Sequence, residues 1–235
     1  MRVRWVTGFL DTPPADASVA ERFWLAVTGT TLSVRRGDGT FATLQPPSGD
    51  ATLRVQVVGD PPARGHLDLH VDDPFEAAGA LRGAAQVWRD DEIVVLRSPA
   101  GIVFCLVAWK GERTAPGGAA RVADQLCLDI PAGSYAAETA FWRAVTGWEH
   151  DPVPDAPQFE RLLAPAPIPM RLLLQRIDAG PPGVHVDLAC ADVPAEVARH
   201  EQLGATVVRR VPGAWTTLRD PAGREYCVTA RPPAR

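Results

Sequence analysis

Polar side chains that can bind or activate a small molecule recur at matching places in this chain. The motif His-x-Asp begins at His66 and again at His185. A glutamine precedes each histidine by ten residues, Gln56 in the first case and Gln175 in the second. An imidazole beside a carboxylate can move protons, orient a ligand or contribute to a metal site. The repeated spacing therefore marks two candidate sites.

One chemistry open to these residues is proton abstraction next to a carbonyl group. Glu225 or Asp187 would then be the general base, while His185 or Gln125 would orient the substrate. A simpler interpretation explains the histidines equally well. His66 or His185 would be half-buried and hydrogen-bonded across a sheet, because unpaired buried polar groups are costly. The catalytic candidates are thus His185, Glu225 and Asp187.

An internal duplication determines where these residues lie. FWLAVTG beginning at Phe23 returns as FWRAVTG beginning at Phe141, and the Pro-Ala-Gly that follows Ser98 returns after Asp220. The order of the repeated segments is the same in both parts of the chain. Self-similarity of this kind indicates two homologous halves.

Each half is expected to form one domain. We predict domain 1 over residues 1–110, a linker over 111–120 and domain 2 over 121–235. The linker is polar and rich in Gly and Pro, and it has no apolar periodicity. Within each half, the apolar patterns indicate a strand, a helix and three strands, and then the same order again. The sequence therefore predicts four βαβββ units.

Alternation along the predicted strands gives each strand one apolar face and one polar face. The polar set of the second half is Gln125, Asp129, Gln175, His185, Asp187, Glu225 and Cys227. The polar set of the first half is Thr7, Asp11, Gln56, His66, Asp68, His70 and Cys105. The apolar faces suit packing against helices.

A series of short motifs in the second half resembles a known superfamily. In order, they are Leu-Asp-x-Pro, Phe-Trp-x-x-x-x-Gly, His-x-Asp-Leu, Leu-Gly-Ala and Asp-Pro-x-Gly. This series resembles the motifs of the vicinal oxygen chelate superfamily, in its glyoxalase-like, bleomycin-resistance-like and dioxygenase-like branch. The chain would contain two such domains in tandem. The resemblance implies an α+β fold in which the βαβββ units pair into two glyoxalase/bleomycin-resistance-type domains. Their curved mixed sheets would have helices outside and a ligand-binding cup inside.

The resemblance also implies which residues face the ligand. Ligand-binding candidates are Gln125, Asp129, Gln175, His185 and Cys227 in the second half, and Gln56, His66 and Asp68 in the first. The motifs that carry this resemblance specify the fold well, but they specify the reaction poorly.

Metal-dependent members of the superfamily take ligands from four strands. These positions fall at Gln125, Gln175, His185 and Cys227 in the second half, and at Thr7, Gln56, His66 and Cys105 in the first. Each half keeps one imidazole, and both carboxylate positions are lost in both halves. Neutral amides and one imidazole are poor partners for a divalent ion. We expect no metal site and no cofactor, unless Glu225 and Asp187 create a divalent site of unusual geometry.

Composition excludes several other classes of protein. The chain has 46% hydrophobic and 22% charged residues and a net charge of -4, as ordinary globular proteins do. It has no Lys/Arg run, and no apolar stretch approaches the roughly 18–20 residues of a membrane span. We therefore expect neither nucleic-acid nor membrane partners. Without a signal-peptide pattern, a cytoplasmic location is expected.

Two functions remain open. The first is a metal-free or weakly metal-dependent protein that binds a small polar or amphipathic molecule in the cup of the second half. The alternative is a lyase, isomerase or epimerase that acts next to a carbonyl. A dioxygenase, which needs two histidines and a glutamate, is not favoured. Because fused halves can mimic the homodimer of single-domain relatives, we expect a monomer, with a homodimer as the other possibility.

Overall fold

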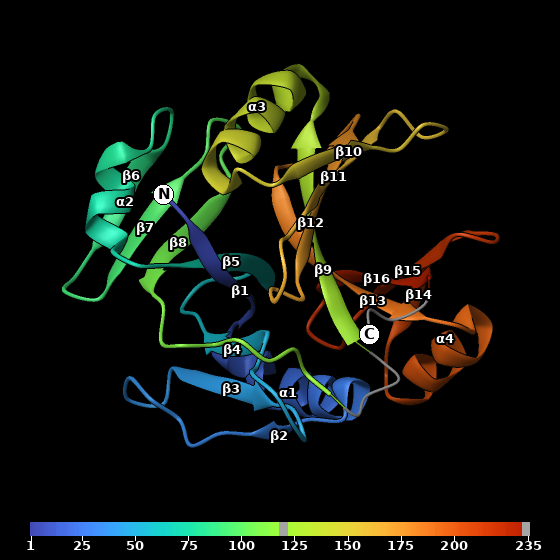
Figure 1. Ribbon diagram of the computed structural model, residues 1–235. Helices are drawn as coiled ribbons and strands as arrows, with labels where there is room; N and C mark the ends of the chain where they lie inside the picture. Colours follow the sequence, from blue (N-terminus) through green and yellow to red (C-terminus); the bar gives the residue numbers. More distant parts are fainter. Residues whose placement is uncertain (118–121, 232–235) are drawn as a thin grey trace. The chain divides into compact units, whose positions relative to one another are not determined.

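The computed structural model describes residues 1–117 and 122–231 (Figure 1). The described residues form two eight-stranded sheets, and the first has the strand order β2-β3-β4-β1-β5-β8-β7-β6. Its strands are β1 (Val3–Thr12), β2 (Thr31–Leu32), β3 (Phe41–Gln45), β4 (Leu53–Val57), β5 (Arg64–Val71), β6 (Ala85–Arg89), β7 (Ile93–Arg97) and β8 (Val103–Ala108).

The second sheet repeats this order as β10-β11-β12-β9-β13-β16-β15-β14. Its strands are β9 (Val122–Pro131), β10 (Glu149–Pro152), β11 (Phe159–Leu163), β12 (Arg171–Ile177), β13 (Gly183–Cys190), β14 (Thr206–Val211), β15 (Trp215–Arg219) and β16 (Glu225–Ala230). The helices are α1 (Pro14–Thr28), α2 (Pro74–Ala80), α3 (Tyr135–Thr146) and α4 (Val193–Gln202), and a short 3-10 turn (Ala132–Ser134) precedes α3.

The chain is α+β and consists of four βαβββ units, as the sequence predicts. Each unit begins with a long strand and a helix and continues with three strands, and the units begin at β1, β5, β9 and β13. The first and last strands of the second unit, β5 and β8, pair in parallel, and so do β13 and β16 of the fourth unit. This parallel pairing positions the candidate site residues.

The contacts within the chain define two compact units. Compact unit 1 comprises residues 1–8, 66–114 and 126–184, and compact unit 2 comprises the described parts of 9–65, 115–125 and 185–235. Compact unit 1 therefore takes β6, β7 and β8 from the first half and β10, β11 and β12 from the second. The limits predicted from the repeat, 1–110 and 121–235, mark the two copies of the duplication. That each of these ranges folds as one domain stays a prediction.

Aromatic side chains form the core of compact unit 1. The ring of Phe104 lies 5.0 Å from that of Trp142, at an interplanar angle of 62°. Phe141, the neighbour of Trp142 in α3, also packs edge to face against Phe104. The indole nitrogen of Trp142 donates to Glu138 Oε1 over 2.7 Å, and Glu138 Oε2 accepts from the Ala100 amide over 2.7 Å. A buried indole and a buried carboxylate thus satisfy one another.

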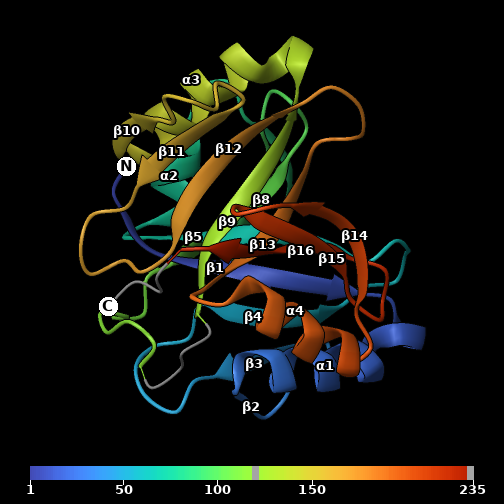
Figure 2. The same ribbon diagram turned by 90° about the vertical axis from the view of Figure 1, so that its right-hand side faces the viewer.

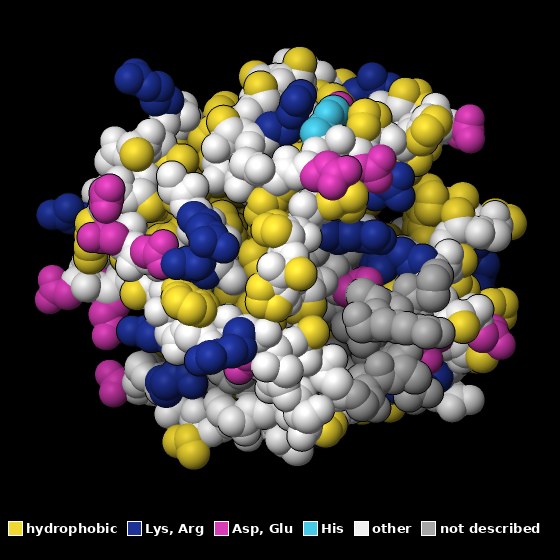
Figure 3. All heavy atoms as spheres, in the orientation of Figure 1, with side chains coloured by type: hydrophobic (Ala, Val, Ile, Leu, Met, Phe, Trp, Pro, Cys, Tyr) yellow, Lys and Arg dark blue, Asp and Glu magenta, His cyan; other side chains and the backbone are white. Residues whose placement is uncertain are grey.

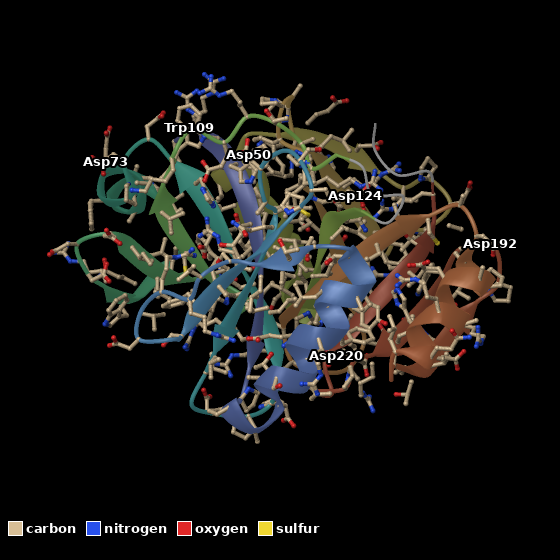
Figure 4. All side chains as sticks on the ribbon, turned by 90° about the horizontal axis from the view of Figure 1, so that it is seen from below. Asp50, Asp73, Trp109, Asp124, Asp192 and Asp220 are labelled. Carbon is tan, nitrogen blue, oxygen red and sulfur yellow. The ribbon has the colours of Figure 1, made fainter. Side chains whose placement is uncertain are left out.

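The core of compact unit 2 follows the same plan with a different acid. The Trp24 ring lies 5.1 Å from the ring of Tyr226. The indole nitrogen of Trp24 donates to Asp220 Oδ2 over 2.8 Å, and Figure 4 shows Asp220 beside α1. Arg224 Nη1 lies 2.8 Å from the same Asp220 oxygen, and both side chains are fully or almost fully buried. The buried charge of Asp220 is therefore paired.

Local signals in the sequence set the ends of the helices. Asp192 accepts a hydrogen bond from the Ala195 amide at the start of α4, as expected of an N-cap. Helix α4 packs against β14, β15 and β16, as the two views in Figures 1 and 2 show. Gly147 ends α3 with a φ of 63°, which lies in the left-handed region that glycine adopts readily.

The surface is mixed in character. On the face shown in Figure 3, acidic and basic side chains lie among apolar ones. Trp88 of β6 is 52% exposed. Among the described residues, no helix has both the length and the apolar character needed to cross a membrane.

Candidate functional site

Three side chains that the sequence singles out meet in compact unit 2. Strand β13 carries His185 and Asp187 on one face, because alternate residues of a strand point the same way. Strand β16 places Cys227 opposite Asp187 in the parallel register. His185 Nε2 lies 3.2 Å from Asp187 Oδ1 and 3.8 Å from Cys227 Sγ. We call these three residues the His185 group.

Neighbouring side chains hold the His185 group in place. Gln125 Nε2 donates a hydrogen bond to Asp187 Oδ2, which leaves Oδ1 facing His185. Thr217 Oγ1 lies 3.5 Å from Cys227 Sγ. No sequence motif pointed to Thr217, although the antiparallel pairing of β15 with β16 places it opposite Cys227.

Cys227 and Asp187 approach the same ring nitrogen of His185. In a triad of nucleophile, histidine and carboxylate, the imidazole uses its two nitrogens for the two partners. Nε2 carries at most one proton and cannot donate to both neighbours. Asp187 Oδ1 is also buried, and no described residue donates a hydrogen bond to it. This arrangement does not suit a proton relay, and it suits a cation that contacts both His185 and Asp187.

The donors of His185 and Asp187 suit a divalent ion of the zinc type. Zinc bonds of about 2.0 Å to nitrogen and to oxygen, at tetrahedral angles, place the two ligand atoms about 3.3 Å apart. The observed separation of His185 Nε2 from Asp187 Oδ1 is 3.2 Å.

The equivalent residues of the first half also meet, in compact unit 1. Strand β5 carries His66 and Asp68 on one face, and β8 places Cys105 opposite Asp68. His66 Nε2 lies 3.6 Å from Asp68 Oδ1. One ligand atom from each of the three side chains lies within 4.8 Å of the other two. We call these residues the His66 group.

A second polar cluster of compact unit 1 lies beside the chain segment that follows β8. His70 is buried; its Nε2 lies 2.9 Å from Thr7 Oγ1 and its Nδ1 lies 3.3 Å from Glu112 Oε1. Burial raises the pKa of Glu112, but the nearby imidazole of His70 and hydrogen bonds from the amides of Glu112 and Lys110 lower it to about 2. Glu112 lies in the predicted linker, where sequence patterns gave no reason to expect a partner.

The remaining candidates have other neighbours. Gln175 accepts a hydrogen bond from Cys127 Sγ over 3.4 Å. Glu225 is about half exposed, and its carboxylate lies 2.6 Å from Arg219 at the surface. Asp129 on β9 and Gln56 on β4 are both partly buried. Their roles, and the catalytic roles of His185, Asp187 and Glu225, stay predictions.

Comparison with known proteins confirms the resemblance seen in the sequence. The family described as "Glyoxalase-like domain" matches residues 9–107 and 125–229, which is one match in each half. No curated protein sequence matches the chain. The tandem arrangement predicted from the repeat is therefore shown by the family match itself.

Solved structures similar to this chain include several dioxygenases. The 2,3-dioxygenase LapB from Pseudomonas sp. KL28 has a TM-score of 0.65 and 14% identity, over 97% of this chain and 92% of that one. Homoprotocatechuate 2,3-dioxygenase from Brevibacterium fuscum, in complex with 3,4-dihydroxyphenylacetate, has a TM-score of 0.65 and 12% identity, over 98% and 82%. At these identities the likeness establishes the fold.

The expectation that the protein uses no metal cofactor is corrected by these findings. The residues of the His66 group bring a nitrogen, an oxygen and a sulfur ligand within 4.8 Å of one another, which is a group that can hold a metal ion. The positions that the superfamily uses offer one imidazole per half and no carboxylate. Asp68 and Asp187 lie two residues after the histidines, on the same strand faces, and add a carboxylate donor in each half. Of these two aspartates, the sequence pointed only to Asp187, together with Glu225.

Proposed function

Because this chain belongs to the glyoxalase-like domain family, we propose that it binds a small polar or amphipathic molecule at the His185 group, with a divalent metal ion as part of the binding site. The observation that carries this proposal is the approach of the buried Asp187 Oδ1 to Nε2 of His185, at 3.2 Å. A cation contacting both side chains would also satisfy the buried Asp187 oxygen, which has no hydrogen-bond donor among the described residues.

Each residue has a distinct part in this proposal. His185 Nε2 and Asp187 Oδ1 would hold the ion, which when bound supplies a Lewis acid for an oxygen atom of the ligand. Gln125 positions Asp187 through its amide, in the way that hydrogen-bond partners of metal ligands orient them. The Thr217 hydroxyl lies beside the Cys227 sulfur and helps to fix its direction.

The test begins with protein freed of metal by a chelator and then titrated with zinc chloride. We expect the His185→Ala variant to bind less zinc per chain than the wild type, and the Cys190→Ser variant, which changes a buried cysteine outside the group, to bind the wild-type amount. With 3,4-dihydroxyphenylacetate as the probe, we expect the melting temperature to rise in the zinc-loaded wild type and less in His185→Ala. Equal zinc binding by the wild type and His185→Ala would refute the proposal.

An enzymatic alternative is favoured by the burial of Asp187 next to an imidazole. A desolvated carboxylate at such a position can remove a proton next to a carbonyl, while His185 orients the substrate. Glu225, the other candidate base, is ion-paired with Arg219 and about half exposed, which favours Asp187 for this part. Exchange of substrate hydrogen for solvent deuterium, abolished in Asp187→Asn and kept in Glu225→Gln, would support this alternative.

A further inference from the structure

We propose that the small molecule bound at the His185 group carries a carboxylate, and that Arg209 on β14 binds this carboxylate. The inference rests on the proposed function, because it names the class of ligand that the same site takes. All the residues that carry it belong to compact unit 2. The ligand would therefore be a carboxylic acid with an apolar body, bound as its monoanion.

The strand register places Arg209 on the sheet face that carries the His185 group. Arg209 pairs with Thr217 of β15, and Thr217 pairs with Cys227 of β16. Cys227 pairs in turn with Asp187 on β13. Residues that pair directly across neighbouring strands share a face of the sheet. One row of side chains thus crosses four strands, from the His185 group to Arg209 on the edge strand.

Two contacts between side chains agree with this assignment of the face. The Thr217 hydroxyl lies 3.5 Å from the sulfur of Cys227, so both side chains point to the same side of the sheet. The Arg209 guanidinium lies 6.0 Å from the centre of the Trp215 ring. Trp215 precedes Thr217 by two residues and therefore shares its face. Arg209 and Trp215 thus lie on the side of the sheet where the His185 group lies.

The positive charge of Arg209 is available to a ligand. Its neighbours Arg210 and Arg219 have acidic partners, Glu201 at 3.9 Å and Glu225 at 2.6 Å. Among the described residues, no carboxylate lies within ion-pair distance of Arg209, whose side chain is exposed. A guanidinium presents a planar fork of N–H groups that matches the two oxygens of a carboxylate. A single guanidinium also matches a single negative charge, which favours a carboxylate over a phosphate dianion.

The spacing of the strands sets the length of the ligand. Neighbouring strands lie about 4.8 Å apart, so the backbones of β14 and β13 are separated by about 14 Å along the sheet. The arginine side chain covers part of this distance. A molecule with one ring, between an oxygen atom at the His185 group and a carboxylate at Arg209, would cover the rest. The partly buried Trp215 offers apolar contact for that ring.

The equivalent row of the first half has a different character. There Asp68, Cys105, Val95 and Trp88 follow one another across β5, β8, β7 and β6. An apolar side chain and an exposed indole thus stand where the second half has a hydroxyl and a guanidinium. Because the cation is the main difference between the two rows, we expect the second half alone to select an anionic ligand.

A matched pair of probes tests the role of charge. The compounds 4-hydroxyphenylacetate and 4-hydroxyphenylacetamide have nearly the same size and differ by one negative charge. Isothermal titration calorimetry measures the dissociation constant of each with the full chain, first with a chelator and then with zinc chloride. We expect the wild type to bind the acid about 5- to 10-fold more tightly than the amide, as an exposed charge-assisted hydrogen bond allows. This preference should fall as salt is added.

Substitutions at two adjacent arginines make the test specific. Arg209→Gln should bind the acid and the amide equally. Arg210→Gln should keep the wild-type preference, because Arg210 points to the other face of the sheet and contacts Glu201. Arg209→Lys keeps the charge without the planar fork and should retain part of the preference. Trp215→Leu should weaken the binding of both probes, because contact with the ring does not require a charge on the ligand.

The proposal is overturned if the wild type does not bind the acid, if it binds the acid and the amide equally, or if the preference survives in Arg209→Gln. These results are separate from the test of the proposed function, which depends on zinc binding through His185. Zinc binding that is lost in His185→Ala, without a preference for the acid, would support the proposed function and refute this inference. A preference for the acid that Arg209→Gln abolishes, without zinc binding, would do the reverse.

Discussion

The pairing of Glu112 with His70 predicts how stability near the end of the first half depends on pH. The carboxyl pKa of Glu112 is lowered from 4.5 to about 2. A carboxyl with a depressed pKa contributes stability at pH values above about 4.5, and this contribution is lost as the pH falls toward 2. A shift of this size corresponds to at most about 3 kcal/mol. Because Glu112 lies close to solvent, we discount it to about 1–2 kcal/mol.

The Glu112→Gln substitution removes the charge and keeps the size of the side chain. We expect the segment around Glu112 to open more often at pH 7, by a factor of about 5–30, which corresponds to one or two kcal/mol. Endoproteinase Lys-C measures this opening directly, because Lys110 is the only lysine in the chain. Its amide donates a hydrogen bond to Glu112 Oε2, so the cleavage site lies in the segment that the carboxylate holds.

The control is Glu92→Gln, which removes the same charge from an exposed residue. We expect it to be cleaved at the wild-type rate, because cleavage of a transiently opened segment follows the population of the open form. Amide hydrogen exchange at Lys110 extends the comparison to low pH, where the difference between the wild type and Glu112→Gln should vanish near pH 2. Equal cleavage of Glu112→Gln and the wild type at pH 7, or a difference that persists at pH 2, would show the reasoning to be wrong.

Three further substitutions, and one control substitution, test assigned hydrogen bonds and an ion pair by urea unfolding. Trp24→Phe removes the hydrogen bond to Asp220 and should cost about 1–2 kcal/mol, whereas Trp88→Phe, at an exposed residue, should change stability by less than about 0.5 kcal/mol. Asp220→Asn leaves the buried Arg224 guanidinium without its ion-pair partner and should cost about 3–5 kcal/mol. Asp73→Ala removes the acceptor for two amides at the start of α2 and should cost about 1 kcal/mol. An equal effect of the two tryptophan substitutions, or a neutral effect of either aspartate substitution, would contradict the assigned contacts.

Periodicity in the sequence predicts the elements and the strand faces of the site. His66 with Asp68, and His185 with Asp187, alternate with apolar residues, so their shared faces follow from the period of a strand. The internal repeat shows that the two sets are equivalent. Strand alternation and helical spacing depend only on residues that are close together in the sequence, so they predict the elements and the faces on which these residues lie.

The partners of the site residues depend on contacts between distant parts of the chain. Thr7 and Gln125 occupy equivalent places, yet one contacts His70 and the other contacts Asp187. Which residue lies opposite Asp187 follows from the parallel register of β13 and β16. Which nitrogen of His185 faces Asp187 depends on the rotation of the side chain, and sequence spacing does not specify that rotation. For these reasons the residue types of the site could be predicted, and the arrangement that could hold a metal ion could not.

Because each compact unit contains segments from both halves of the chain, neither half can be lost without damage to both units. Each unit draws one βαβββ unit from each half of the chain. Loss of the second half would therefore leave Phe104 without Trp142 and Trp24 without Tyr226, so both hydrophobic cores would be broken at once. Selection for folding thus maintains both duplicates together, even where only one of them binds a ligand.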